Sequence, residues 1–261
     1  MKIVIVGAGN LATHISKALL SAGNEIMQVY SRTIESATVL ASSLGTEAVC
    51  DVEDIAKDAD LYVVSVTDKA LETLIPPLCK GRENSVFAHT AGSMPMSVFE
   101  GCARHFGVIY PMQTFTKSRI LDFNKIPCFV EASDEPTFVM LRTLCLTISS
   151  RVIPLSSDDR KYLHLAAVFA SNFVNHCYNM TSSILRNHGL DFDVMYPLID
   201  EVAAKIHEMT PAEAQTGPAL RYDRNVMDKQ ISLLECQPEV QEVYEIMSRG
   251  IHKMHKEYDK L

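Results

Sequence analysis

The sequence predicts an α/β fold with a mostly parallel sheet over residues 1–153, followed by an all-α domain over residues 154–261. In the first part, short apolar runs alternate with helical patterns, which is typical of βαβ units around a parallel sheet. After Pro154 the β-branched runs disappear and helical patterns take over. A chain of 261 residues is long enough for two domains of modest size, each with its own core.

The first part opens with a short apolar strand and then alternates strands with helices. The predicted strands cover residues 2–6, 25–30, 47–49, 60–66, 85–89, 107–110, 127–131 and 151–153, and the clearest helices cover 10–22, 34–44, 69–78 and 135–149.

The second part is predicted to contain helices at 158–187, 191–208, 222–235 and 239–258. Ser157 and the two aspartates after it are typical N-cap and first-turn residues. Residues 162–185 carry no formal charge and are numerous enough to cross a bilayer, but they include too many Asn, His and Ser side chains for hydrocarbon. We therefore expect a helix buried in protein and no membrane partner.

The composition is that of a soluble globular protein. Hydrophobic residues make up 47% of the chain and charged residues 21%, which excludes disordered and fibrous classes. The net charge of −8, with no dense basic run, argues against nucleic acid as a partner. The seven cysteines are scattered and form no CxxC pair, and the first apolar run is too short for a signal peptide. These features predict a cytoplasmic protein without a disulfide framework or a metal site.

A glycine motif follows the first predicted strand. Residues 7–12 read GAGNLA, the GxGxxA pattern that opens a dinucleotide-binding Rossmann fold, and a helical pattern comes directly after it. The first glycine allows a tight turn, the second lets backbone approach a pyrophosphate, and the helix N-terminus faces the anion. The predicted cofactor-binding residues here are Gly7, Ala8, Gly9, Asn10 and Leu11; a glycine turn without a ligand is the alternative.

The end of the second predicted strand distinguishes NADP from NAD. A site that prefers NAD places Asp or Glu about 20 residues after the glycines to bind the ribose 2′-hydroxyl. Here the strand ends in Ser31, Arg32 and Thr33, with no acid. Arginine presents a planar charged fork to a 2′-phosphate, so we predict NADP(H) as the cofactor. The alternative is that Arg32 is a solvated surface arginine.

Small and polar residues also follow the later strands. Ligands of open parallel sheets lie beyond the carboxyl ends of the strands, so we predict further cofactor contacts from Val66, Thr67, Thr90 and Ala91. Turn chemistry alone would explain about half of these residue types.

The uncharged helix carries a polar face. At 100° per residue, its polar members lie within one sector; they are His164, Ser171, Asn172, Asn175 and Asn179. Such a stripe either forms an internal polar network or faces a ligand. Both readings stay open at this point.

Five blocks give the chain a family resemblance: GAGNLA at 7–12, TAGS at 90–93, YPMQTF at 110–115, HLAAVFASNF at 164–173 and TGPALRYD at 216–223. With them it resembles the two-domain oxidoreductases that join a Rossmann-like half to a helical half of unknown function. The helical half is similar to the C-terminal domain of 6-phosphogluconate dehydrogenase. These proteins are relatives of pyrroline-5-carboxylate reductase, and some are labelled NADP oxidoreductases dependent on a deazaflavin coenzyme.

The resemblance implies which residues form the cleft side of the helical domain: His164, Ser171, Asn172, Thr216, Gly217, Pro218, Arg221 and Asp223. Two departures limit it. Tyr110 stands where the family block usually begins with His, and Val168 stands where related β-hydroxyacid dehydrogenases carry a lysine four residues before the asparagine. His164, one turn before Val168, is the nearest group able to donate a proton near neutral pH.

These observations predict an NADP(H)-dependent oxidoreductase that transfers a hydride to or from a small carbonyl, imine or hydroxyl substrate. The predicted catalytic residues are His164 as proton donor, with Asn172 and Arg221 orienting the substrate; an internal interaction between Arg221 and Asp223 is the alternative for the arginine. The alternatives for the function are electron exchange between NADP and a deazaflavin coenzyme, or a non-catalytic NADP-binding regulatory protein. The largely apolar helices of the second domain also predict a homodimer.

Overall fold

The computed structural model describes residues 1–258 and divides the chain into two compact units, Met1–Asn172 and Phe173–Leu261. The last strand ends at Pro154, and the described residues after it form only helices and connections. The division into compact units therefore places the helical residues 157–172 in unit 1. The predicted domain boundary at 153/154 coincides with the change from strands to helices, but as a boundary between domains it stays a prediction.

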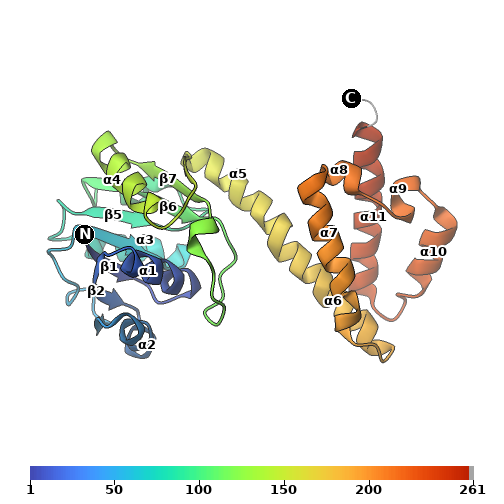
Figure 1. Ribbon diagram of the computed structural model, residues 1–261, viewed down its shortest axis with the longest axis horizontal. Helices are drawn as coiled ribbons and strands as arrows, with labels where there is room; N and C mark the ends of the chain where they lie inside the picture. Colours follow the sequence, from blue (N-terminus) through green and yellow to red (C-terminus); the bar gives the residue numbers. More distant parts are fainter. Residues whose placement is uncertain (259–261) are drawn as a thin grey trace. The chain divides into compact units, whose positions relative to one another are not determined.

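Unit 1 contains a single eight-stranded sheet (Figure 1). Its strands are β1 (Lys2–Val6), β2 (Glu25–Tyr30), β3 (Glu47–Val49), β4 (Leu61–Val64), β5 (Val86–His89), β6 (His105–Pro111), β7 (Cys128–Ala132) and β8 (Val152–Pro154), in the order β3-β2-β1-β4-β5-β6-β7-β8. All neighbours pair in parallel except β6 and β7, which are antiparallel. The predicted α/β Rossmann class with a mostly parallel sheet is confirmed.

Both faces of this sheet are covered, because each central strand is apolar on both sides. In β1, Ile3 and Ile5 join a core with α1 (Asn10–Ser21), α2 (Ile34–Leu44) and α4 (Glu135–Leu146). Val4 and Val6 point to the opposite face, where they pack with α3 (Asp68–Cys79) and the short 3₁₀ helix η1 (Met96–Phe99).

The long predicted helix is present but not uniform. It begins as α5 (Ser157–Ala167), passes through a π-helical segment η3 (Val168–Phe173) and continues as α6 (Val174–Asn187). Ser156 caps its start by accepting a hydrogen bond from the Asp159 N–H. A π segment turns the chain by less than 100° per residue, so the polar stripe predicted from an unbroken α-helix is wrong in its angles beyond Val168.

Unit 2 is helical in its described residues. After α6 come η4 (Phe192–Met195), α7 (Tyr196–Glu208), α8 (Pro211–Ala214), α9 (Pro218–Arg221), α10 (Arg224–Ser232) and α11 (Pro238–Tyr258). α9 and α10 pack on α11. Among the described residues, no helix is both long and apolar enough to cross a bilayer.

Candidate functional site

Gly7 lies at the crossing of three chain segments. Its N–H donates to the Tyr30 carbonyl at 2.7 Å, where β2 ends, and the Ser65 N–H after β4 donates to the Val6 carbonyl at 2.7 Å. Its φ is +119°, and a Cβ here would lie 2.1 Å from the Ser65 carbonyl oxygen. Both the backbone conformation and the close approach therefore require glycine.

Gly9 differs, because the protein itself does not require a glycine there. Its φ of −78° suits any residue, and a Cβ would meet no atom within 4 Å. The first helical hydrogen bond runs from the Thr13 N–H to the Gly9 carbonyl. The N–H groups of Asn10 and Leu11, in the first turn, therefore have no partner within the helix and point out of its N-terminus. The open space at Gly9 and these free amides fit a pyrophosphate lying against α1.

The segment after β2 carries the three residues predicted to contact the 2′-phosphate. The Ser31 N–H donates to the Val49 carbonyl at 3.1 Å, which fixes the exit of the strand. Thr33 is the N-cap residue of α2, and its hydroxyl donates to Ser36. Arg32 is exposed, and among the described residues no ion pair or hydrogen bond engages its guanidinium.

The exits of β4 and β5 lie beside the glycine turn. Val66 packs in the core next to Gly7, and Thr67 is the exposed N-cap residue of α3. Thr90 is buried, and its N–H donates to the Val64 carbonyl at 3.1 Å, while Ala91 follows it. Since β1, β4 and β5 are parallel neighbours, these four predicted contacts share one edge of the sheet with the glycine motif.

A tyrosine and a histidine meet at the end of β6. The Tyr110 hydroxyl lies 3.0 Å from Nδ1 of His164, with the rings edge to face. Burial raises the pKa of Tyr110, so its hydroxyl stays protonated near neutral pH. When that hydroxyl donates to Nδ1 of a neutral His164, the ring proton sits on Nε2, the nitrogen that is left to face a ligand.

Gly92 leaves the space that this pair occupies. A Cβ at Gly92 would lie 2.6 Å from Nδ1 of His164 and 3.0 Å from Cε2 of Tyr110. The loop after β5, the end of β6 and the helix α5 thus converge on the imidazole.

A buried ion pair anchors α5 one turn before His164. Arg160 is 1% exposed and donates to Glu131 of β7 at 2.6 Å and to the Met94 carbonyl at 2.6 Å. Glu131 also accepts the N–H and the hydroxyl of Ser157. Arg160 and His164 are four residues apart on the same helix face, so this network sets where the imidazole lies.

His89, at the end of β5, is buried, and within residues 1–258 its ring hydrogen-bonds to backbone groups alone. Its Nδ1 accepts from the Ala91 N–H at 3.1 Å, so Nε2 carries the proton and donates to the Pro95 carbonyl at 3.3 Å. Burial is the main cause that lowers the pKa of His89 to about 4. This neutral histidine holds the 90–95 loop in place.

The other two predicted catalytic residues belong to other segments of the chain. Asn172 is exposed in the π-helical segment at the end of unit 1, and its side chain makes no hydrogen bond to another described residue. Arg221 belongs to unit 2, in the last turn of α9. The alternative interaction with Asp223 is not formed, because that carboxylate caps α10 by accepting from the Val226 N–H at 3.3 Å.

The TGPALRYD block has a defined shape around Arg221. Gly217, with a φ of 107°, precedes the first turn of α9, and Tyr222 ends it in the left-handed region at a φ of 54°. The Tyr222 ring stacks on His252 of α11 with the ring centroids 4.3 Å apart, and the Arg224 guanidinium lies over the same Tyr222 ring, 5.6 Å from its centroid. Within residues 1–258, no cluster of His, Cys, Asp and Glu could hold a metal ion.

Two family models match this chain, and together they cover most of it. "NADP oxidoreductase coenzyme F420-dependent" matches residues 2–87, and a domain of unknown function (DUF2520) matches residues 126–251. No curated protein matches the chain.

Solved structures extend the likeness over nearly the whole chain. A Bacteroides fragilis protein described as a "putative NADP oxidoreductase" is 49% identical, with a TM-score of 0.93, over 97% of this chain and 98% of that one. A Thermotoga maritima protein at 23% identity (TM-score 0.75; 96% and 99% covered) shares the fold. So does an imine reductase from Myxococcus stipitatus in complex with NADP+, at 15% identity (TM-score 0.67; 100% and 94% covered).

The chain belongs to the family of two-domain oxidoreductases that the Bacteroides fragilis protein represents. The predicted family and the predicted oxidoreductase class are confirmed. The Tyr110–His164 bond, the place of Gly92 and the Arg160–Glu131 anchor were not predicted, because each joins residues far apart in the sequence. The family block at residues 110–115, with Tyr110 in place of the usual histidine, had pointed to that position.

Proposed function

We propose that this protein is an NADP(H)-dependent oxidoreductase that acts on a small carbonyl, imine or hydroxyl substrate, with His164 as the proton donor. The observation that carries the proposal is the Tyr110–His164 pair, which stands at the same edge of the sheet as the glycine motif. NADPH, when bound, supplies the hydride.

The residues that would hold the cofactor fit its parts. The open backbone at Gly9 and the free amides of Asn10 and Leu11 suit the pyrophosphate. Arg32, with Ser31 and Thr33 beside it, suits the 2′-phosphate that distinguishes NADP from NAD. Four more predicted cofactor contacts lie at the same edge of the sheet, at the ends of the strands between the glycine motif and the Tyr110–His164 pair: Val66, Thr67, Thr90 and Ala91.

His164 is well placed for general acid chemistry. In the protonated ring, Nδ1–H donates to the Tyr110 oxygen and Nε2–H can protonate a product oxygen or nitrogen, which leaves the neutral imidazole. Tyr110 keeps the ring in one orientation, and Gly92 gives it room. Asn172 and Arg221 are proposed to orient the substrate, the arginine through a carboxylate or similar anion.

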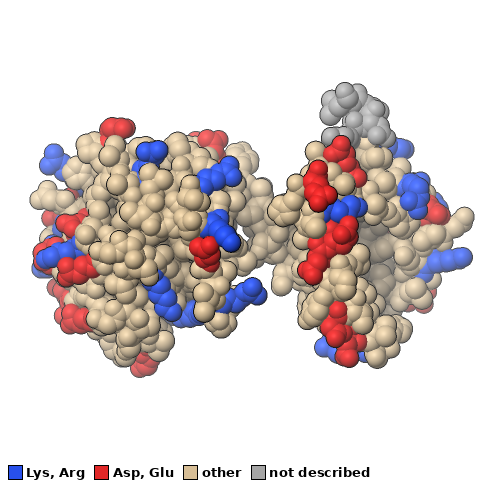
Figure 2. Space-filling view, viewed as in Figure 1, with Lys and Arg blue, Asp and Glu red and all other residues tan. Residues whose placement is uncertain are grey.

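We propose a homodimer formed through the helical unit. Leu198, Val202 and Ile206 of α7 are each more than half exposed, and they are spaced four apart along one face. Figure 2 shows a row of acidic side chains along this unit, with residues that are neither basic nor acidic on either side of it. An exposed apolar stripe of this kind marks a surface that another protein covers.

The cytoplasm is the proposed location, because all seven cysteines are free thiols, as a reducing compartment would keep them. On the face of unit 1 in Figure 2, acidic side chains lie among the basic ones over most of the surface, and the basic side chains gather only at its lower right. This supports a small-molecule substrate over a nucleic acid.

The proposal is tested by NADPH oxidation with purified protein and a panel of imines, keto acids and aldehydes. We expect turnover with at least one class of substrate, and a fall in kcat of about 100-fold or more in His164→Ala, in the range that general acid catalysis supplies. NADPH affinity should stay within about twofold of the wild type, since His164 is not placed against the phosphates. Full turnover in His164→Ala would remove it from the mechanism.

The cofactor assignment has its own control. Arg32→Ala should weaken NADPH binding by about tenfold or more while leaving NADH binding nearly unchanged, because only NADPH carries the 2′-phosphate. Arg104→Ala removes another exposed arginine of unit 1 and should change neither. Tight NADPH binding without turnover on any substrate would favour the regulatory protein, and turnover that needs a deazaflavin would favour the coenzyme exchange.

A further inference from the structure

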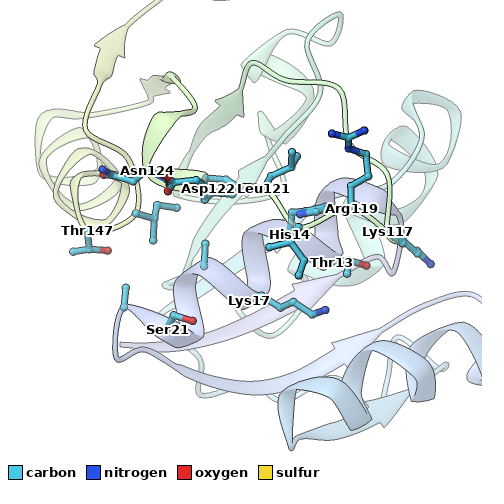
Figure 3. A pocket seen from close by; sticks show the side chains of 15 residues that line it. Thr13, His14, Lys17, Ser21, Lys117, Arg119, Leu121, Asp122, Asn124 and Thr147 are labelled. Carbon is cyan, nitrogen blue, oxygen red and sulfur yellow. Dashed lines mark hydrogen bonds between the residues drawn. The ribbon is translucent and has the colours of Figure 1, made fainter. Parts of the chain in front are cut away.

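A cavity of about 440 Å³ lies outside the site described above, between α1, the 113–124 loop and the end of α4 (Figure 3). None of the proposed cofactor or catalytic residues lines it. Its volume is in the range of small-molecule sites. It follows the flank of α1 from Thr13 to Ala22, leading away from the glycine motif.

The polar residues that line this cavity, which forms a groove along α1, differ between its two ends. Figure 3 shows His14, Lys17, Lys117 and Arg119 toward one end, where the Arg119 and Lys117 side chains extend away from each other. The other end has Ser21, Asn124 and Thr147, which are neutral hydrogen-bonding groups. Apolar side chains, among them Ile148 and Leu121, line the space between. This arrangement suits an elongated ligand with an anionic group at one end.

The three permanent cations have no carboxylate partner. Among residues 1–258, no ion pair engages Lys17, Lys117 or Arg119. The acidic lining residue, Asp122, is engaged by the Asn124 N–H at 3.2 Å and by Lys125 at 3.8 Å. In a chain with a net charge of −8, an unpaired group of cations at one cavity mouth is a local field that attracts an anion.

The loop that carries two of these cations is fixed to the domain at both ends. Nε2 of His14 donates to the Thr116 carbonyl at 3.0 Å, and the same carbonyl accepts the Arg119 N–H at 3.0 Å. The Phe115 ring contacts His14 and Phe123, and Phe123 is buried. The backbone on either side of Lys117 and Arg119 is therefore fixed to the domain, while the two side chains are exposed.

We propose that this groove binds a small organic anion, a phosphate ester or a polycarboxylate, at a site separate from the cofactor. Lys17, Lys117 and Arg119 bind its anionic group, and the polar far end binds its neutral part. The cations are solvent-exposed, so the binding weakens as salt is raised.

The test is calorimetric titration of the full-length protein with pyrophosphate and, separately, with citrate, at fixed ionic strength and with and without NADPH. We expect Lys117→Gln/Arg119→Gln to weaken binding by about tenfold or more. Lys80→Gln/Arg104→Gln removes the same charge from exposed positions of unit 1 outside the groove, and should leave the Kd nearly unchanged. Tighter binding of pyrophosphate or of citrate identifies a phosphate or a carboxylate site.

Three outcomes overturn the proposal. The first is an absence of binding for both probes. The second is an equal loss of affinity in the two double variants, which would indicate only a general attraction between the protein and anions. The third is displacement of the probe by NADPH, which would place the probe in the cofactor site. The comparison of the two double variants does not depend on NADPH, so it holds whether or not the proposed function is correct.

Discussion

At the scale of single residues, Gly92 decides whether the Tyr110–His164 hydrogen bond can form. A Cβ at this position would lie 2.7 Å from Cγ of His164 and 2.6 Å from Nδ1. The imidazole would have to move, and a displacement of about 1 Å can cost about 100-fold in rate. We expect Gly92→Ala to lower kcat by about 10- to 100-fold with little change in NADPH affinity.

The measurement is steady-state kinetics together with NADPH titration, with Gly250→Ala as the matched control. Gly250 lies in α11, where a Cβ would meet nothing within 4 Å, so the same change should leave kcat unaltered. A fully active Gly92→Ala would show that the position of His164 at this pair is unimportant for turnover.

His89 makes the stability of unit 1 depend on pH. Its pKa is about 4 in the folded protein against an ordinary value of 6.5, so between these values the unfolded chain takes up a proton that the folded chain does not. The contribution is fully present above pH 6.5 and is lost as the pH falls toward 4. The slope is about 1.4 kcal/mol per pH unit for one such group.

Urea unfolding of the wild type and of His89→Gln at several pH values between 7 and 4 measures this contribution. Glutamine does not titrate, so the variant should lose less free energy of unfolding than the wild type over that interval, whatever its stability at pH 7. Parallel curves for the two proteins would mean that His89 is not held neutral by its burial.

At the scale of elements, the site depends on how α5 is fastened to the sheet. Arg160 is buried and Glu131 is its carboxylate partner, while a second exposed pair on the same helix, Lys161–Asp158, lies in solvent. Removing one partner of a buried pair leaves the other charge unpaired and costs about 3 kcal/mol or more. Glu131→Gln should therefore lower the free energy of unfolding by about 3 kcal/mol and reduce kcat.

Denaturant unfolding and kinetics test this element-scale prediction, with Asp158→Asn as the control that should hardly move either. Glu131→Gln/Arg160→Met removes both charges and should recover part of the lost stability, since no charge is left buried. If the double variant were no more stable than Glu131→Gln, the burial of an unpaired arginine would not be the cause of the loss.

Sequence patterns predicted most elements of unit 1 because its central strands and helices have clear apolar periods. They did not give the antiparallel pairing of β6 with β7, since an apolar run has the same pattern in either direction. They also did not give the one-turn helices that Pro211 and Pro218 open between the predicted helices 191–208 and 222–235, where the missing N–H of each proline costs nothing. The π segment η3 also has no periodic signature in the sequence.

The candidate site could be predicted only where its residues lie close together in the sequence and form a recognisable motif. The glycine motif places Gly7 and Gly9 two positions apart in one turn, so a short pattern identifies both. Tyr110 and His164 are 54 positions apart, and nothing in either local pattern states that they meet. The chemistry of the histidine could be inferred from sequence, but its orienting partner required the fold.

At the scale of the whole molecule, the helical unit has too little buried apolar surface of its own. Its buried hydrophobic residues are Leu185, Ala219, Met227 and Leu234 in the described part of the chain. By contrast, Leu198 and Val202 of α7 are more than half exposed. Covering such a stripe with a second copy removes apolar area from water, worth about 25 cal/mol per Å².

We therefore expect wild-type protein to sediment at twice the chain mass of 29.0 kDa, and Leu198→Gln/Val202→Gln to shift it to the single-chain mass. The control, Asp200→Asn/His207→Asn, changes two exposed residues on the opposite side of α7 and should leave the dimer intact. Circular dichroism of the monomeric variant should retain the helical signal, so that dissociation is separated from unfolding. A wild type that sediments at 29.0 kDa over all concentrations would exclude the dimer, whereas a dimer that survives Leu198→Gln/Val202→Gln would place the interface on another face of the helical unit.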